Sequence, residues 1–506
     1  MRLPPIVARA AALALLAAAP LAAAAVLDYD DARHLLDRTG FGASHAEIEH
    51  LVGTSRSEAA KAILAGARTS ALTPPPAWTA APGPLRYPRT GATDDERKTF
   101  RREQIREGLE LRGWWVGEML ATPSPLTERM TLFWHNHFVS SQQKVRLAEL
   151  MYRQNVTLRA HALGNFGTLL HAIARDPAMI VYLDSARNRS GAPNENFARE
   201  LMELFTLGEG HYGEPDVKEA ARAFTGWSLD RDSGEFRFRP LLHDYGSKTI
   251  LGKSGRFDGD DVVDLLLAQP ATAEFVVRKL WREFVSPDPD AAEVRRIAAR
   301  FRDSKYDIKT ALYALLTSDA FYAPEHRGTL IKSPVDLVVG TLRQFDMRPR
   351  NAIPFAVAVA GMGQNLFAPP NVKGWPGQEA WINASTLLAR KQFLDKLFRA
   401  DGAAIGAQQA ATDDPMMVAA TAGGKDDKDP DQARAARFLR AVDRGVRSVQ
   451  FDSAAWFAQW NAGDDRSREE AAAASLLAVT PQSTPKAREP LALVRELTQD
   501  AAYELK

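Results

Sequence analysis

Apolar side chains recur every three or four residues along most of residues 28–400. The pattern runs through DDARHLLDRTGFG at 30–42, AEIEHLVG at 46–53 and TAEFVVRKLWREFV at 272–285. Side chains at this spacing lie on one face of an α-helix, so the pattern predicts amphipathic helices. Helix boundary signals agree with it, because Ser124 precedes Pro125 and Gly208 follows an apolar run. We therefore expect a mostly helical, all-α main domain over residues 28–400.

Two stretches interrupt the helical pattern. Residues 73–95 are rich in Pro and Gly, as in TPPPAWTAAPGP, and we expect a loop there. Residues 226–242 place WSLD and FRFRP on either side of the turn-forming DSG at 232–234. This arrangement predicts a small β-hairpin around residues 226–240, as an excursion from the helical body.

The last hundred residues change in character. From about residue 402 to 435 the chain consists largely of Ala, Gly, Asp and Lys, as in TAGGKDDKDPDQ. A segment with so few large apolar side chains cannot offset the entropy lost on ordering, so we expect a flexible insert there. Amphipathic stretches return at RAARFLRAVDRGV (434–446). We expect residues 436–506 to form C-terminal helices that dock on the main domain.

The N-terminus has the features of a secretory signal peptide. Arg2 and Arg9 precede an apolar run, Pro20 interrupts it, and residues 22–25 offer a small-residue cleavage site. The alternative, an uncleaved membrane anchor, requires a longer run without proline. We therefore expect residues 1–25 to be removed, and the mature protein to be periplasmic or extracellular. The rest of the chain contains no second long apolar segment, so we expect no transmembrane span after cleavage.

Composition excludes several classes of function. The chain has no cysteine, which excludes disulfides, thiolate nucleophiles and cysteine-ligated metals. Its formal net charge is +1, and removing Arg2 and Arg9 lowers it by two, to about −1. Proteins that bind nucleic acid usually show a basic excess, so we expect no such partner.

Residues 194–208, NENFARELMELFTLG, carry the densest group of polar side chains. Asn196, Arg199, Glu200 and Glu203 are spaced to share one helix face. The apolar positions fall on the opposite face: Phe197, Leu201, Leu204 and Phe205. Asn194 lies in an amide-rich start suited to capping a helix or binding a ligand. An ordinary solvent-exposed helix face with an Arg–Glu pair would show the same spacing. Two interpretations therefore stay open, a functional surface and a solvated face.

A second polar helix is expected at EPDVKEAARAFTGW (214–227). Glu219 and Arg222 are three residues apart and can pair. If the two helices pack as a hairpin through residues 211–213, their acidic side chains lie side by side. Paired carboxylates raise each other's pKa and suit general acid/base catalysis, or bind divalent cations. The alternative is a purely structural Arg–Glu network.

Two histidines lie close together in LTERMTLFWHNHFVSS (126–141). His135 and His137 point roughly 200° apart on a continuous helix and share a ligand only if the helix ends between them. A metal site would also need carboxylates from elsewhere. The candidate ligands of a divalent metal ion are His135, His137, Glu200 and Glu203. The alternative is one core histidine and one capping histidine.

Two loops complete the set of candidate segments. His243, Asp244 and Lys248 follow the predicted hairpin in LLHDYGSKTILG, either as functional groups or as parts of a turn. In FAPPNVKGWPGQEAWINAS (367–385), Trp375 and Trp381 either stack on a sugar or fill the core beneath a rigid loop. Two polar side chains, Asn371 and Lys373, flank them.

An ordered series of these motifs resembles a bacterial family known as domain-of-unknown-function family 1800. The series is LLDRTGFGAS (35–44), FWHNHF (133–138), NENFARELMELFTLG (194–208), DVKEAARAFTGW (216–227), HDYGSKTILG (243–252) and PPNVKGWPGQEAW (369–381). The resemblance covers nearly all of residues 28–400 and implies an exported, largely helical protein. It also implies a genomic neighbour, an exported protein similar to the alkaline-phosphatase/sulfatase superfamily. It implies no activity and no catalytic residues.

Two hypotheses follow. In the first, the chain is an exported helical protein with one polar pocket, either a metal-assisted hydrolase or a ligand-binding protein, that acts on an extracellular polymer. Its expected catalytic residues are Glu200, Glu203, His135, His137, Arg199, Lys248 and His243. Its expected binding residues are Asn194, Asn196, Glu219, Arg222, Asp244, Asn371, Lys373, Trp375 and Trp381. In the second, the chain is a non-enzymatic scaffold or partner of a co-exported sulfatase/phosphatase-like protein. The motif residues then pair internally, and an exposed apolar patch lies elsewhere.

Overall fold

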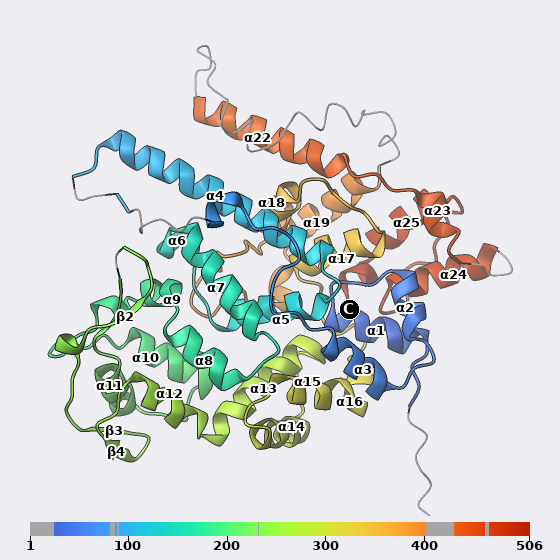
Figure 1. The fold of residues 1–506 in the computed structure, drawn as a ribbon. Helices are drawn as coiled ribbons and strands as arrows, with labels where there is room; N and C mark the ends of the chain where they lie inside the picture. The colour runs from blue at the N-terminus through green and yellow to red at the C-terminus, as the bar shows by residue number, and fades with distance from the viewer. Residues whose placement is uncertain (1–24, 81–86, 89–90, 231, 400–429, 461–464) are drawn as a thin grey trace, which may run out of the picture.

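The chain folds into a largely helical body with two small antiparallel hairpins (Figure 1). This computed structural model describes residues 25–80, 87–88, 91–230, 232–399, 430–460 and 465–506. The expected all-α class with a small hairpin is confirmed. The predicted signal peptide, apart from Ala25, and most of the predicted insert lie outside the described residues. Residues 430–435, predicted as the end of that insert, begin α22 instead, because the amphipathic pattern extends N-terminally into its first turn.

The helices of the first half follow one another with short connections. They are α1 (Tyr29–Thr39), α2 (His45–Leu51), α3 (Arg56–Ala65), η1 (Ala77–Ala80), α4 (Asp94–Ala121), α5 (Pro125–His137), α6 (Gln142–Val145), α7 (Ala148–His161), α8 (Phe166–Ala174), α9 (Pro177–Tyr182), η2 (Ser185–Arg187), α10 (Asn196–Glu200), the π-helix η3 (Leu201–Thr206) and α11 (Glu214–Ala223). The short η1 lies within the predicted 73–95 loop.

The second half continues the same architecture after the hairpins. Its helices are η4 (Pro240–Leu242), α12 (Gly259–Leu267), α13 (Pro270–Phe284), α14 (Ala291–Asp303), α15 (Ile308–Leu316), α16 (Asp319–Tyr322), η5 (Pro324–His326), α17 (Pro334–Gln344), α18 (Ile353–Gly361), η6 (Gln378–Trp381), α19 (Ala384–Leu397), α22 (Pro430–Arg447), α23 (Ser453–Phe457), α24 (Asp465–Leu476), α25 (Pro490–Gln499) and η8 (Ala501–Glu504). In the C-terminal part, α22 packs on α18 and α19, and α25 packs on α19.

The two hairpins are adjacent in sequence. Strands β1 (Trp227–Leu229) and β2 (Phe236–Phe238) pair antiparallel, which confirms the predicted hairpin. Strands β3 (Lys248–Ile250) and β4 (Lys253–Gly255) form a second hairpin that the sequence analysis read as a loop. Its turn residues Leu251 and Gly252 both have positive φ, as two-residue hairpin turns of the right twist require. A leucine rarely adopts that conformation, which explains why the turn was not predicted.

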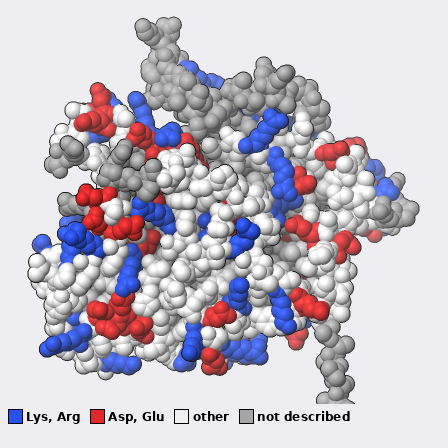
Figure 2. Space-filling view, viewed as in Figure 1, with Lys and Arg blue, Asp and Glu red and all other residues white. Residues whose placement is uncertain are grey.

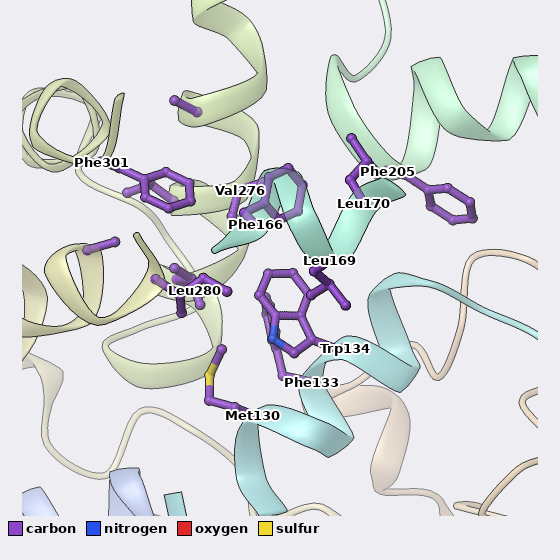
Figure 3. Close-up of a cluster of buried hydrophobic side chains, with 14 of the residues drawn as sticks. Met130, Phe133, Trp134, Phe166, Leu169, Leu170, Phe205, Val276, Leu280 and Phe301 are labelled. Atoms are coloured by element: carbon purple, nitrogen blue, oxygen red, sulfur yellow. The ribbon is translucent and has the colours of Figure 1, made fainter. Parts of the chain in front are cut away.

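One hydrophobic core, core 1, is built by α1–α3, α5, α7–α16 and the π-helix. Figure 3 shows Trp134 of α5 between Phe133, Phe166 and Leu169, with Phe205 of the π-helix to one side. The indole of Trp134 is fully buried, and its Nε1 donates to the carbonyl oxygen of Ala162 at 2.9 Å. Because the one polar atom of this ring is satisfied, the large side chain is buried without an unpaired donor.

A second core, core 2, is built by α4, α17–α19 and the C-terminal helices. The rings of Phe345 and Trp456 lie 4.9 Å apart within it, and Tyr503 near the C-terminus is fully buried. Helix α5 contributes Trp134 to core 1 and Leu132 to core 2, so the two cores meet along this helix. Figure 1 places the C-terminal end of the chain beside α1 and α5.

A polar seam separates the two cores. Arg129 of α5, with a side chain 2% exposed, is ion-paired with Glu283 at 2.8 Å and with Asp336 at the start of α17. Its Nε donates to the carbonyl oxygen of Gly40 at 2.8 Å. Lys506 Nζ reaches the other oxygen of Asp336 at 2.8 Å. The seam thereby ties α1, α5, α13, α17 and the C-terminus together.

None of the helices in the described residues has the length and apolar composition needed to cross a membrane.

On the face shown in Figure 2, acidic and basic side chains are interspersed, and no broad area is basic alone. This distribution matches the near-neutral composition of the chain.

We expect Arg129→Met to lower the free energy of unfolding by about 3–5 kcal/mol, because it leaves the buried carboxylate of Asp336 without its guanidinium and also breaks the pair with Glu283. Urea unfolding measures the change. The control is Arg199→Met, which breaks more exposed pairs with Glu195 and Glu214 and should cost less than about 1 kcal/mol. Equal losses of unfolding free energy in the two variants would show that the ion pairs of Arg129 stabilise the protein no more than the exposed pairs of Arg199 do.

Candidate functional site

The NENFARELMELFTLG segment is not one regular α-helix. After α10 the chain continues as the π-helix η3, in which Leu207 N donates to Met202 O, five residues back, at 2.8 Å. Thr206 Oγ1 donates to Leu201 O, also five residues back, at 2.6 Å. Single π-helical turns concentrate at functional sites, although the geometry alone assigns no function. The predicted burial of Phe197, Leu201 and Phe205 is observed.

Two members of the predicted polar stripe, Arg199 and Asn196, have local structural partners. Arg199 is ion-paired with Glu214 at 2.6 Å and with Glu195 at 3.0 Å, which holds α10 against the start of α11. The side-chain oxygen of Asn194 accepts from Asn196 N at 3.0 Å, as a cap does. The two helices therefore pack as the hairpin hypothesis supposes, but Arg199 is occupied by carboxylates of its own chain.

Glu200 and Glu203 differ in their surroundings. Glu203 accepts a hydrogen bond from the Tyr212 hydroxyl at 2.8 Å. Glu200 is half-buried, and among the described residues none hydrogen-bonds its carboxylate. Burial and then the charge of Glu203 raise the pKa of Glu200, while Arg199 and Lys373 oppose the shift. Glu200 and Lys373, from two distant motifs, are therefore electrostatic neighbours.

His135 and His137 are both buried on α5 and have different partners. Asn155 Nδ2 donates to His135 Nε2 at 3.0 Å, and the His135 ring lies 4.7 Å from that of Trp115. The Nε2 atom of His137 lies 3.0 Å from the carbonyl oxygen of Phe205. Burial lowers the pKa of His135 to about 3 and holds that of His137 well below its usual value, so both rings are neutral at pH 7.

The predicted metal site is not formed by its four candidate ligands. Helix α5 continues through His137, so the two imidazoles stay on different sides of it. Among the described residues, no group of three or more His, Asp or Glu side chains is placed to hold a metal ion. His135, His137, Glu200 and Glu203 therefore do not converge, and their proposed role as a ligand set is wrong.

Lys279 of α13 is a polar group that the sequence analysis missed. Its Nζ donates to the carbonyl oxygen of Leu204 and to Nδ1 of His137, at 3.1 Å each. Since Nδ1 accepts, the proton of the neutral ring is on Nε2, which donates to Phe205 O. Burial lowers the pKa of Lys279 to about 7. The two side chains thus satisfy two carbonyl oxygens at the end of the π-helix, where regular helical partners are lost.

The 243–248 loop and α11 form a structural network rather than an open site. Arg222 is ion-paired with Glu219 at 2.7 Å and with Asp244 at 2.8 Å, and the hydrogen bond from Arg222 lowers the pKa of Asp244 to about 2. Lys248 is buried within β3, where its Nζ donates to Asp244 O at 2.6 Å. His243 Nδ1 lies 2.9 Å from Thr225 O. The catalytic roles predicted for His243 and Lys248 are therefore not supported by their positions, because their polar atoms are used in folding this loop.

The tryptophan loop is fastened to α5 through Asn136. The Asn136 side-chain oxygen accepts from Trp375 N at 2.7 Å, and its amide nitrogen donates to Trp375 O at 3.4 Å. A Cβ on Gly374, which has φ +88°, would lie 2.2 Å from that side-chain oxygen. Trp375 and Trp381 are buried, so they do not form an exposed sugar-stacking platform. Asn371, at the surface, accepts from Lys373 N at 2.9 Å and shapes the loop.

A cavity of ≈ 90 Å³ lies at the polar seam, and we call it the seam cavity. Both tryptophans border it, together with the apolar side chains of Leu132, Phe133, Leu330 and Ile331. Its polar lining consists of Arg129, Asn136, Arg282, Glu283, Ser333, Asp336, Gln364, Gln378 and Lys506. Of the residues predicted as a site, only Trp375 and Trp381 line this cavity. The five candidate segments are therefore not gathered around the seam cavity.

Asp336 and Lys506, two charged groups of the seam cavity, shift each other's pKa. Burial alone would raise the pKa of Asp336, but Arg129 and Lys506 hold it below its usual range. Burial lowers the pKa of Lys506, and Asp336 opposes that shift. Trp375 is 4% exposed, and its Nε1 is buried without a hydrogen-bond partner. An unpaired buried N–H costs about 1–3 kcal/mol, so this donor destabilises the fold as it stands.

The sequence held weak signals for the missed residues. Asn136 lies between the two histidines of FWHNHF, and the prediction of imidazole ligands from this motif did not include it. Arg129 is one of many arginines in amphipathic stretches, and Lys506 is the last residue of the sequence. Their importance comes from tertiary burial at the seam, which no local spacing encodes.

We expect the free energy of unfolding to rise with pH from about 7 to 10.5 through Lys279, because the unfolded chain still holds a proton that the folded chain has released. Lys279→Met should remove this contribution and reduce the slope by at most about 1.4 kcal/mol per pH unit. Urea unfolding across this pH window measures it, with Lys98→Met at an exposed position of α4 as the control. An unchanged slope in Lys279→Met would contradict the assignment.

Comparison with known proteins places the chain in a family. A family model described as "Protein of unknown function (DUF1800)" matches residues 34–499. A search of curated proteins and a search of solved structures found no match. The match extends the resemblance of the motifs through most of the C-terminal helices and covers nearly the whole chain. The chain therefore belongs to the DUF1800 family of proteins of unknown function.

Proposed function

We propose that the protein is an exported binding protein that holds a small acidic group, such as the carboxylate of an extracellular polymer, in the seam cavity. The observation that carries this proposal is Trp375, a side chain that borders that cavity and whose buried Nε1 has no hydrogen-bond partner in the structure. A folded protein rarely leaves such a donor unsatisfied unless water or a ligand accepts its hydrogen bond. Motifs from distant parts of the chain, FWHNHF and PPNVKGWPGQEAW, meet at this point.

The size of the cavity limits what can enter. A volume of ≈ 90 Å³ holds several water molecules or one small functional group. This is well below the roughly 300–1,000 Å³ of a pocket that encloses a drug-sized ligand. The proposal is therefore that a terminal or pendant group enters, while the rest of the ligand stays outside.

The charge of the lining favours an acceptor. Three cationic side chains, Arg129, Arg282 and Lys506, border the cavity against the carboxylates Glu283 and Asp336. The carboxylate oxygens of Asp336 are already engaged by Arg129 and Lys506. An incoming carboxylate would meet these cationic side chains in a partly desolvated site, where charge-assisted hydrogen bonds are strong.

We expect sodium acetate to raise the thermal unfolding temperature of the mature protein more than acetamide does, at matched ionic strength, because acetate carries the charge and acetamide does not. Trp375→Phe should reduce the acetate response, since it removes the unpaired N–H while keeping an aromatic ring. Trp114→Phe is the matched control, because the Trp114 Nε1 already donates to Thr73 O at 3.3 Å and lies outside the cavity. Equal responses of both variants and the parent protein would overturn the proposal.

A second function, docking of a co-exported protein, is favoured by a patch of exposed apolar side chains at the first hairpin. Leu241 is 99% exposed and Tyr245 is 61% exposed, and Phe238 and Leu242 are also exposed nearby in sequence. The ring of His243 lies 5.5 Å from that of Phe238 and 4.7 Å from that of Tyr245. Clustered exposed apolar side chains mark interaction surfaces. The internal pairing of Arg199, Arg222 and Lys248 also agrees with a scaffold role.

For this second function, we expect Leu241→Ser to weaken a complex with the co-exported sulfatase/phosphatase-like protein by about tenfold, as loss of a central apolar anchor does. Surface plasmon resonance with the two purified proteins measures it. Leu72→Ser is the control, because Leu72 is 51% exposed but lies outside the patch. Absence of any complex, or equal weakening by both substitutions, would reject the docking function.

A further inference from the structure

The exposed apolar side chains at the first hairpin lie beside arginines that have no acidic partner among the described residues. We call this surface the hairpin patch, and it consists of Phe238, Leu241, Leu242 and Tyr245 with Arg187, Arg189 and Arg239. Figure 1 shows strand β2, which carries Phe238, at the left edge of the body. No residue of the patch lines the seam cavity, so the patch is independent of the binding function proposed for that cavity.

The backbone beneath Leu241 is held in place although the side chain is not. Pro240 begins the short helix η4, in which Leu242 N donates to Arg239 O at 3.0 Å. Gly226 has φ +83°, and a Cβ there would lie 2.7 Å from Arg239 O, so only glycine permits this close approach. Arg239 N also donates to Gly226 O at 2.8 Å. The fold therefore presents Leu241 to solvent on a fixed support.

The apolar part of the patch protrudes. Leu241 is 99% exposed, which means that no neighbouring side chain packs on it, and Tyr245 is 61% exposed. A protein partner would need a pocket that encloses this leucine, whereas the hydrocarbon of a lipid layer closes around a protruding side chain of any shape. Leucine and aromatic side chains are also the types that enter the boundary between lipid head groups and acyl chains.

Two segments rich in arginine meet at the patch. Residues 185–193 and 236–243 together contain four arginines and no Asp or Glu. Ser190 N donates to Leu242 O at 2.8 Å, which places the two segments side by side. The acidic side chains of the hairpin lie at its other end, in the turn that joins β1 to β2. The apolar tip is therefore bordered by positive charge alone within these segments.

Three of these four arginines are not neutralised. Arg187 and Arg189 are exposed, and among the described residues neither side chain has an ion pair or a hydrogen bond. Arg239 makes one side-chain hydrogen bond, to a backbone oxygen at 3.3 Å. Arg237 is the exception, because it is ion-paired with Asp230 at 2.9 Å. Cations without a carboxylate partner attract an anionic surface, and each contributes to the attraction.

We propose that the hairpin patch docks the protein on an anionic lipid surface. Leu241 and its apolar neighbours enter the boundary between head groups and acyl chains, and the three arginines without an acidic partner bind the lipid phosphates. The positive charge selects an anionic layer over a neutral one, and the apolar tip selects a lipid layer over a soluble polyanion. The co-exported protein would compete with lipid for the same side chains.

Sedimentation of the mature protein with lipid vesicles tests the proposal. One set of vesicles is phosphatidylcholine alone, and the other is an equimolar mixture with phosphatidylglycerol. We expect the protein to partition more tightly onto the mixed vesicles, by about fivefold for each arginine without an acidic partner, and to be released by high salt. No sedimentation with either set, or equal partitioning onto both, would overturn the proposal.

Matched variants locate the surface that binds. Leu241→Ser should weaken binding to the mixed vesicles at least about tenfold, because it removes one buried leucine side chain. Leu72→Ser, at a position 51% exposed outside the patch, should not. Arg189→Gln should weaken binding to the mixed vesicles about fivefold, whereas Arg101→Gln at an exposed position of α4 should have little effect. Equal effects of each variant and its control would contradict the assignment to the patch.

A fluorescent probe reports whether the tip enters the lipid. The chain contains no cysteine, so Leu241→Cys carries a single environment-sensitive fluorophore in the patch. Its emission should shift to the blue with mixed vesicles, and that of the same probe at Leu72→Cys should not. An unshifted emission from protein that sediments would show that another surface binds, and would overturn the proposal.

Two outcomes separate this proposal from the functions considered for the rest of the molecule. A complex with the co-exported protein that Leu241→Ser abolishes, together with no vesicle binding, would assign the patch to a protein partner and overturn the lipid proposal. The seam variant Trp375→Phe should leave vesicle binding unchanged, because Trp375 borders the seam cavity and lies outside the patch. A loss of acetate binding therefore leaves the lipid proposal standing, and the reverse also holds.

Discussion

The buried pairing of Arg129 with Asp336 is the interaction on which the two halves of the molecule depend. Burying two charges costs several kcal/mol each, and the cost is offset only where hydrogen bonds satisfy both ions. The seam meets that condition, because Arg129 also reaches Gly40 O and Glu283, and Lys506 completes Asp336. If the two cores met through apolar side chains alone, no charged group would lie at their boundary. The ionic seam instead leaves a small polar space there, and that space is the seam cavity.

The π-helix uses for folding some of the residues that were expected to form a functional site. One polar stripe was expected on an α-helix, but the wider turn of η3 leaves carbonyl oxygens that Lys279 and His137 must satisfy. His137 is therefore committed to the backbone and is not available as a metal ligand. Glu200 is the member of the stripe whose carboxylate keeps no hydrogen bond among the described residues, with Lys373 as an electrostatic neighbour. The π turn thus brings side chains of α5 and α13 together on its carbonyl oxygens.

Local spacing in the sequence was sufficient to predict the helical class, the first hairpin and the buried face of residues 194–208, because these depend on neighbours along the chain. It could not distinguish a solvated polar face from paired ions, so Arg199, Arg222 and Lys248 were assigned to a site although their partners lie in their own chain. The β3–β4 turn was missed because Leu251 adopts a conformation that leucine rarely takes. The seam residues Arg129, Glu283 and Asp336 come from segments far apart in sequence, and only the fold brings them together.

The central claim is that the ionic seam joins core 1 and core 2 into one cooperative unit. Differential scanning calorimetry of the parent protein and of Arg129→Met tests this most directly, since a two-state unit shows equal calorimetric and van't Hoff enthalpies. We predict a single transition with equal enthalpies for the parent protein, and two resolved transitions once Arg129 is replaced. Two transitions in the parent protein, or a single unchanged transition in the variant, would contradict the claim that Arg129 couples the cores.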